Sequence, residues 1–115
     1  MIKRLLIIDT YPNKRNLANI NDYLQNSQSM NEQQIVFLMD YGVFYLLDEF
    51  WTGIFKKDIL FYTNAYDAEK YSLPFIEDVI FSGMPALHQL IQTTKHVDHF
   101  KEEAIFPFPL LTDKI

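Results

Sequence analysis

The chain has 115 residues, of which 49% are hydrophobic and 22% charged, values typical of one soluble globular domain with its own core. The formal net charge of −5 argues against direct binding of nucleic acid, because phosphate contacts need a surplus of Lys and Arg. There is no cysteine, which excludes disulfides, zinc–thiolate sites and thiol nucleophiles. Only 3 glycines are present, so a glycine-rich nucleotide-binding loop is excluded, and we expect no cofactor.

The first residues do not have the pattern of a targeting or membrane segment. The apolar run at residues 5–8 ends at Asp9, which makes it too short for the core of a signal peptide. No stretch of the chain approaches the length of a transmembrane helix. These features predict a cytoplasmic protein without membrane contact.

The first part of the chain alternates apolar runs with amphipathic segments. Residues 5–8 are continuously apolar and lead into a polar loop, which predicts a buried strand. Leu17, Ile20 and Leu24 recur at steps of three and four, the spacing of a helix with one buried face. Residues 35–39 form a second apolar run and predict a second buried strand.

The rest of the chain continues this alternation. Apolar residues at helical spacing over residues 43–54 predict a second helix that follows its strand with almost no loop. Further strands are predicted at residues 58–63, 78–81 and 96–100. A short helix is expected at about residues 66–71, and another begins near Ser82 and Gly83, with Pro85 early in it. The Pro- and Phe-rich tail at about residues 104–115 is expected to be extended and to pack on its own domain or on a neighbour.

Strands that alternate with helices predict one three-layer α/β domain over residues 1–115. Its core would be a mostly parallel five-stranded sheet with helices on both faces. In such sheets, ligands bind beyond the carboxyl ends of the strands. The ligand-pocket candidates are therefore residues that follow the predicted strands: Asp9, Asp40, Tyr41, Asn64, Asp67 and Ser82.

Several segments match, in order and spacing, the pattern of one known family. Residues 40–43, Asp-Tyr-Gly-Val, resemble an Asp-Gly-Val turn that follows an apolar strand. Residues 59–73 resemble the family's third strand and short helix, with Asp67 at the place of a helix Asp, although Tyr-Ser-Leu replaces the usual final Arg-Gly-Leu. Residues 79–87 resemble the next strand and helix. The chain thus resembles the DsrE/DsrF/DsrH superfamily over roughly residues 2–100, most closely its DsrH/TusB branch.

This resemblance implies that the chain belongs to a sulfur-relay complex but does not itself carry sulfur. In DsrE-like carriers a catalytic cysteine follows the third strand, and a gap-free alignment puts Asn64 at that position. Asparagine cannot hold a persulfide, because the transfer needs a thiolate. The DsrH/TusB branch includes subunits without the cysteine that act as structural members of a complex. The resemblance therefore implies a non-catalytic structural or regulatory subunit of an oligomeric sulfur-relay complex, of the kind related to tRNA thiolation.

The same resemblance implies protein partners. The chain would form a homo-oligomer, as a dimer, trimer or hexamer, or a heteromer with cysteine-bearing DsrE-like subunits. Most aromatic side chains are expected in the core or at helix edges. The interface candidates are Tyr45, Trp51, Tyr66, Phe106 and Phe108.

Two other functions stay open. A small-ligand-binding module would use the pocket at the carboxyl edge of the sheet, around Asp9, Asp40, Asn64 and Ser82. A cysteine-free enzyme would use Asp40 or Asp67 as a general base, with no evident partner residue for either carboxylate. Helix capping explains both aspartates without any chemistry, and side-chain to backbone bonds explain Asn64 and Ser82 equally well.

The histidines do not predict a metal site. The chain has 3 histidines, His88, His96 and His99. His96 and His99 would lie on opposite faces of a strand, because side chains alternate along it. A shared metal would then need His88 and one of the other two, and we assign neither a metal nor a catalytic residue.

Overall fold

The structure is a computed structural model, and it describes residues 3–29, 32–101 and 104–107. The strands are β1 (Lys3–Ile8), β2 (Gln33–Leu38), β3 (Leu60–Asn64), β4 (Val79–Ser82), β5 (His96–Lys101) and β6 (Ala104–Pro107). The helices are α1 (Lys14–Ser29), the 3₁₀ helix η1 (Asp40–Leu46), α2 (Asp48–Ile54), α3 (Ala65–Lys70) and α4 (Met84–Thr93). The predicted strands and helices thus appear in the predicted order.

All strands of the described residues belong to one sheet, in the order β4-β3-β2-β1-β5-β6. The first five are parallel to one another, which confirms the mostly parallel five-stranded core. The sixth strand, β6, is antiparallel to β5 and was not predicted, since the tail was expected only to be extended. Pro107 is the last residue of this strand, which lies at the edge of the sheet. Proline has no N–H to donate, and at an edge this interrupts no hydrogen bonds between interior strands.

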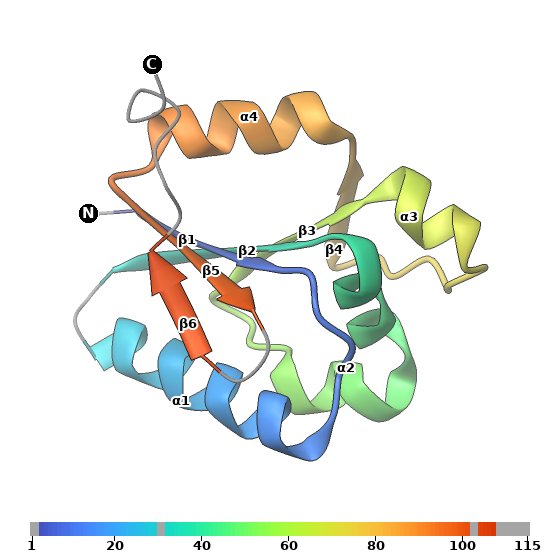
Figure 1. The fold of residues 1–115 in the computed structure, drawn as a ribbon, viewed down its shortest axis with the longest axis horizontal. Helices are drawn as coiled ribbons and strands as arrows, with labels where there is room; N and C mark the ends of the chain where they lie inside the picture. Colours follow the sequence, from blue (N-terminus) through green and yellow to red (C-terminus); the bar gives the residue numbers. More distant parts are fainter. Residues whose placement is uncertain (1–2, 30–31, 102–103, 108–115) are drawn as a thin grey trace.

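The sheet is covered on both faces, which makes three layers (Figure 1). We call the side with α1, η1 and α2 the α1 face, and the opposite side the α4 face. Connections between parallel strands are almost always right-handed. From β1 to β4, each strand is added to the sheet on the same side of the strand before it, whereas β5 is added on the other side of β1. With right-handed connections, this change of direction places α4 on the opposite face of the sheet from α1 (Figure 1).

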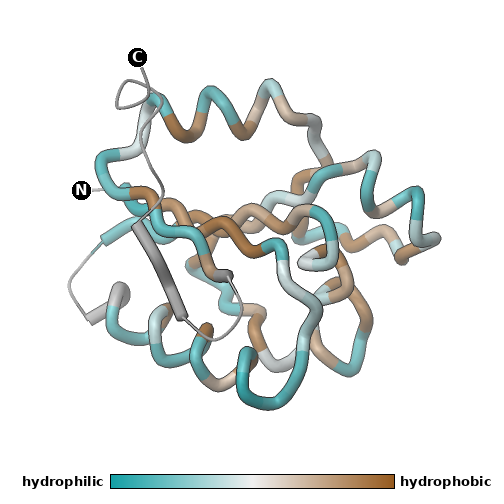
Figure 2. Tube along the Cα trace, in the orientation of Figure 1, coloured by the Kyte–Doolittle hydropathy of each residue, from teal (hydrophilic) through white to brown (hydrophobic). Residues whose placement is uncertain are grey.

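The two central strands are apolar on both faces. Residues Leu5 to Ile8 of β1 and Ile35 to Leu38 of β2 are at most 3% exposed. A strand buried on both sides has a continuous apolar run instead of an alternating one, as the sequence shows. Figure 2 shows this concentration of hydrophobic residues in the middle of the sheet, with α1 and α3 more polar.

The core on the α1 face is the larger and contains many aromatic rings. Its buried members come from β1, β2, β3, α1, η1 and α2, with contributions from α3, β4 and β5. Trp51 packs edge-on against Phe61, with ring centroids 4.9 Å apart. Tyr45 is fully buried in the same cluster.

The core on the α4 face is smaller. Its buried members are Leu5, Ile7, Ile35, Phe37, Leu87, Ile91 and Val97, so its buried strand residues come from β1, β2 and β5. On the same face of the sheet, Leu60 of β3 is 38% exposed and Ile80 of β4 is 41% exposed. The ten-residue helix α4 therefore leaves part of the apolar sheet uncovered.

The expectation of one continuous helix over residues 43–54 is wrong. The chain instead forms η1 and then α2, with Leu47 between them in an extended conformation at φ −65° and ψ 138°. Gly42 lies in η1 so close to β1 that a Cβ there would be 2.0 Å from the carbonyl oxygen of Ile8. The same oxygen accepts a hydrogen bond from the N–H of Met39 at 3.0 Å, so β1, β2 and η1 meet at this point.

A polar network links α1 to the amino-terminal half of the sheet. Arg4 Nε lies 2.9 Å from Glu32 Oε1, and Arg4 Nη1 lies 3.2 Å from Asp98 Oδ2. The hydroxyl of Tyr23 donates to the same Asp98 oxygen. Burial and the Asp98 carboxylate raise the pKa of Tyr23, which keeps the hydroxyl protonated as a donor.

None of the helices in the described residues combines the length and apolar character needed to cross a lipid bilayer.

Candidate functional site

The parallel strands β1 to β4 end at one edge of the sheet, and the polar candidates follow them there. Asp9 comes after β1, Asp40 after β2, and Asn64 and Ser82 are the last residues of β3 and β4. Asn64 and Ser82 are paired in the register of these two strands. The topology therefore places the predicted carboxyl-edge candidates along a single edge.

Asn64 and Asp67 have structural hydrogen bonds at this edge. The Oδ1 atom of Asn64 accepts from the N–H of Asp67 at 3.3 Å, so Asn64 caps α3. Asn64 is 6% exposed. Asp67 Oδ2 accepts from the N–H of Asp40 at 2.8 Å, so Asp67 satisfies the first donor of η1 instead of one in its own helix.

Asp40 has an unusual backbone and a crowded electrostatic environment. Its φ of 48° lies in the left-handed region, where Asp is one of the better tolerated residues. Partial burial raises the pKa of Asp40, and the nearby carboxylates of Asp67 and Asp9 raise it further, while Lys70 opposes them. Two neighbouring carboxylates therefore act on Asp40 at this edge.

Exposed and half-buried aromatic rings form a row beside these carboxylates. Tyr41 is 56% exposed, and its ring centroid lies 6.1 Å from that of Tyr71. Phe44 lies 4.9 Å from Tyr71 and 5.0 Å from Tyr11. The row connects η1 with α3 and with the loop after β1.

The interface candidates differ in how exposed their side chains are. Tyr45 is 0% and Trp51 is 8% exposed, so both lie inside the domain's own core and offer no surface to a partner. Tyr66 is 74% exposed at the first turn of α3. Phe106 is paired with His99 in the β5–β6 ladder, and Phe108 lies outside the described residues.

A pocket of about 150 Å³ lies at the carboxyl edge, between the sheet and α4. Its lining residues are Ile7, Asp9, Met39, Met84, Leu87, His88, Ile91 and His99. His99 Nε2 lies 2.8 Å from Asp9 Oδ2. Of the predicted candidates, Asp9 belongs to this lining, whereas Asp40, Asn64 and Ser82 do not. Ser82 Oγ is buried and has no hydrogen-bond partner within the described residues.

The pairing of His99 with Asp9 was not predicted from the sequence. In the structure Ile7 is opposite His99, because β5 lies directly beside β1. The alternation of side chains along a strand indicates only that His99 lies on the same face of the sheet as Val97. That β5 returns next to β1 is not visible in the order of the segments.

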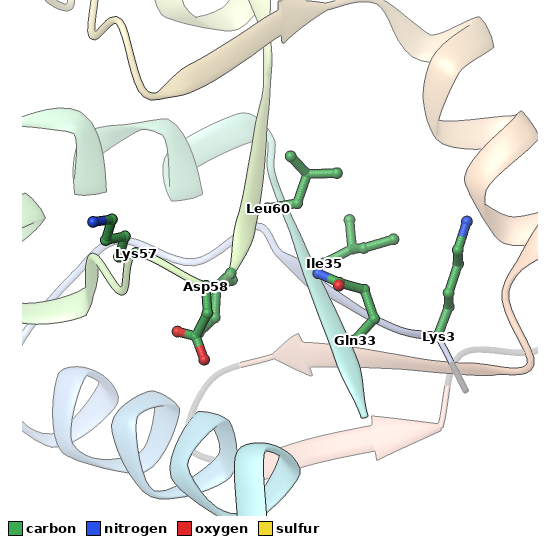
Figure 3. Close-up of a pocket in the computed structure, with 7 residues that line it drawn as sticks. Lys3, Gln33, Ile35, Lys57, Asp58 and Leu60 are labelled. Carbon is green, nitrogen blue, oxygen red and sulfur yellow. The ribbon is translucent and has the colours of Figure 1, made fainter. Parts of the chain in front are cut away.

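A second pocket of about 430 Å³ lies at the opposite, amino-terminal edge. Figure 3 shows Ile35 and Leu60 between Lys3 on one side and Lys57 on the other. Gln33 and Asp58 also line it. This hollow is the end of the uncovered part of the α4 face, with an apolar floor and lysines beside it.

Within residues 3–29, 32–101 and 104–107, no group of three His, Asp or Glu side chains is arranged to hold a metal ion. No protein-family model matches the sequence, and searches of curated proteins and of solved structures also found no match.

Proposed function

We propose that this chain is a non-catalytic subunit of the DsrE/DsrF/DsrH type, which contributes a docking surface instead of a thiol to an oligomeric sulfur-relay complex in the cytoplasm. The partner is a cysteine-bearing subunit of the same fold. The support comes from the environment of Asn64 and from the uncovered apolar surface around β4.

Asn64 is the observation on which the proposal rests. It occupies the position that the resemblance assigns to the sulfur-carrying cysteine, and the whole chain contains no cysteine. Its side chain is buried and engaged as the cap of α3. The position is therefore used to stabilise the fold, and sulfur transfer in such a complex requires a thiolate from another subunit.

The surface around β4 supports the second half of the proposal. β4 is an edge strand, so among the described residues one side of its backbone faces no other strand of this sheet. On the α4 face, Leu60 and Ile80 are exposed by 38% and 41%. On the other side of β4, Phe75 is 76% exposed and stacks on Phe81 with centroids 5.2 Å apart. An open edge with apolar side chains on both sides is suited to pairing with another protein.

Two lysines at one end of this surface favour acidic side chains on the partner at that end. Lys3 and Lys57 flank the exposed Leu60 at the amino-terminal end of the patch (Figure 3). Complementary charges at the rim of an interface steer association and fix its orientation. We therefore expect the partner to place Asp or Glu side chains opposite these lysines.

The first experiment measures the mass of the assembly. Native mass spectrometry and light scattering of the chain with a cysteine-bearing DsrE-like protein should show a complex larger than either component. The chain alone distinguishes self-assembly from a mixed complex. A monomer at every concentration that also fails to bind such a partner contradicts the proposal.

Variants then locate the surface. Ile80→Lys and Phe75→Glu should each abolish the complex, because they place a charge in an apolar contact. Gln92→Lys is the matched control, since Gln92 is exposed on α4 away from β4. Equal binding by all three variants would exclude the β4 surface.

Asn64 gives a separate test. Asn64→Ala should lower the free energy of unfolding by about 1 kcal/mol through loss of the cap. Asn64→Ser keeps a capping oxygen and should retain most of the stability. Both variants should still form the complex, and loss of sulfur transfer by the complex with Asn64→Ser would show that residue 64 takes part in the chemistry.

A further inference from the structure

The pocket under α4 has an apolar wall and one polar corner. Ile7 and Met39 contribute the apolar side chains from the sheet side, and Met84, Leu87 and Ile91 contribute them from α4. Leu87 and Ile91 are at most 5% exposed, whereas Met84 is 39% exposed at the mouth of the pocket. Two of these wall residues are methionines, whose unbranched side chains adapt their shape to a bound molecule.

The polar corner consists of Asp9 and His99. His99 Nε2 lies 2.8 Å from Asp9 Oδ2, within the distance of an ion pair. A carboxylate accepts about four hydrogen bonds through its two oxygens, so Asp9 can hold His99 and a ligand donor at once. His88 lines the pocket from α4 and is exposed.

The ionised carboxylate of Asp9 gives this corner a negative charge, which His99 can at most neutralise. A neutral His99 leaves the pair with the charge of Asp9, and a protonated His99 makes the pair neutral. The carboxylate of Asp40 lies close enough to interact with Asp9. Binding of an anion is therefore disfavoured, and binding of a cation or a neutral donor is favoured.

The size of the pocket limits the ligand. An apolar cavity of about 150 Å³ in another protein takes up a single benzene ring. The pocket here has a volume of about 150 Å³. A body of one ring or a short branched chain fits, whereas a nucleotide does not.

We propose that this pocket binds a small primary amine with an apolar body of about one ring, whose ammonium group contacts Asp9 while its hydrocarbon part lies among Ile7, Leu87 and Ile91. The site is independent of the proposed assembly, because the β4 surface does not contribute to its lining. It lies against the carboxyl-terminal parts of β1, β2 and β5, near the common position of ligands in sheets of this kind.

The test uses benzylamine as the probe and follows the amide signals of Leu87, Ile91 and His99 by NMR titration. Benzyl alcohol has nearly the same shape without the charge, and benzoate has the opposite charge. We expect saturable shifts at these three residues, with benzylamine bound about tenfold more tightly than benzoate and benzyl alcohol between them.

Two variants separate the charge from the cavity. Asp9→Asn should weaken benzylamine about tenfold and leave benzyl alcohol almost unchanged. Met84→Trp should fill the mouth of the pocket and weaken both ligands, and the exposure of Met84 makes the fold tolerant of this change. Asp78→Asn removes one exposed carboxylate away from the pocket and is the matched control, with no change expected.

The proposal is overturned if benzylamine gives no saturable shifts at Leu87, Ile91 and His99 in the unchanged protein. It is also overturned if benzoate binds as tightly as benzylamine, or if Asp9→Asn and Asp78→Asn give equal affinities for benzylamine.

Discussion

The two faces of the sheet are covered to different extents. On the α1 face, α1, η1 and α2 bury a core that includes Tyr45, Trp51 and Phe61. On the α4 face, the ten-residue helix α4 covers β1, β2 and β5 and leaves Leu60 and Ile80 exposed. Both the pocket under α4 and the amino-edge pocket lie on this less covered side. The difference indicates that the α1 face supplies most of the packed core, whereas the α4 face leaves more of the sheet open to binding.

The largest expected effect comes from matched leucine substitutions on the two faces. Leu6 on the α1 face is 0% exposed, and Leu60 on the α4 face is 38% exposed. Leu6→Ala should lower the free energy of unfolding by about 2–5 kcal/mol, because it leaves a cavity in a packed core. Leu60→Ala should cost about 1 kcal/mol or less. Urea unfolding followed by circular dichroism measures both, and equal losses would mean that the faces are equally packed.

An intermediate effect is expected from the polar groups of each face. Tyr23→Phe removes the hydroxyl that donates to Asp98 beneath α1, and should lower the free energy of unfolding by about 1–2 kcal/mol. Asp9→Asn removes a charge from the pocket on the other face, and should change stability by less than about 0.5 kcal/mol. A larger cost for Asp9→Asn than for Tyr23→Phe would show that the Asp9–His99 pair mainly stabilises the fold.

The smallest expected effect concerns Asp40 and depends on pH. The pKa of Asp40 is raised above 3.8 in the folded chain, so its ionised form destabilises the native state. This penalty is absent below pH 3.8, where the carboxyl is protonated in both states, and is complete above the raised pKa. Asp40→Asn, which tolerates the same backbone conformation, should therefore raise the melting temperature slightly at pH 7 and not at pH 3. A stabilisation of equal size at both pH values would contradict this origin.

The order of strands and helices follows from the sequence because burial leaves local patterns. The continuous apolar runs at residues 5–8 and 35–39 identified the two central strands, and both are buried on both faces. The local sequence does not indicate that the predicted second helix is divided at Leu47. The apolar residues before and after Leu47 keep the spacing of one continuous helix. The strand β6 was not predicted because the prolines in its segment are typical of irregular structure. Proline is tolerated in a strand only at the edge of a sheet, where β6 pairs with β5.

The candidate site was less predictable than the fold. Placing Asp9, Asp40, Asn64 and Ser82 at one edge required only that their strands be parallel, and this holds. The pocket itself depends on which strand lies beside β1 and on where α4 crosses the sheet. Both are contacts between residues far apart in the chain, as for Asp9 and His99, and the sequence of one protein does not encode them in any local pattern.

The crowding at Gly42 has a consequence for how this sequence can change over time. Any side chain at this position would collide with the carbonyl of Ile8 and push η1 away from β1. Position 42 is therefore restricted to the residue that has no side chain. In relatives of this chain, an unvarying glycine here would record contact between two backbones and would not by itself indicate a ligand or a reaction.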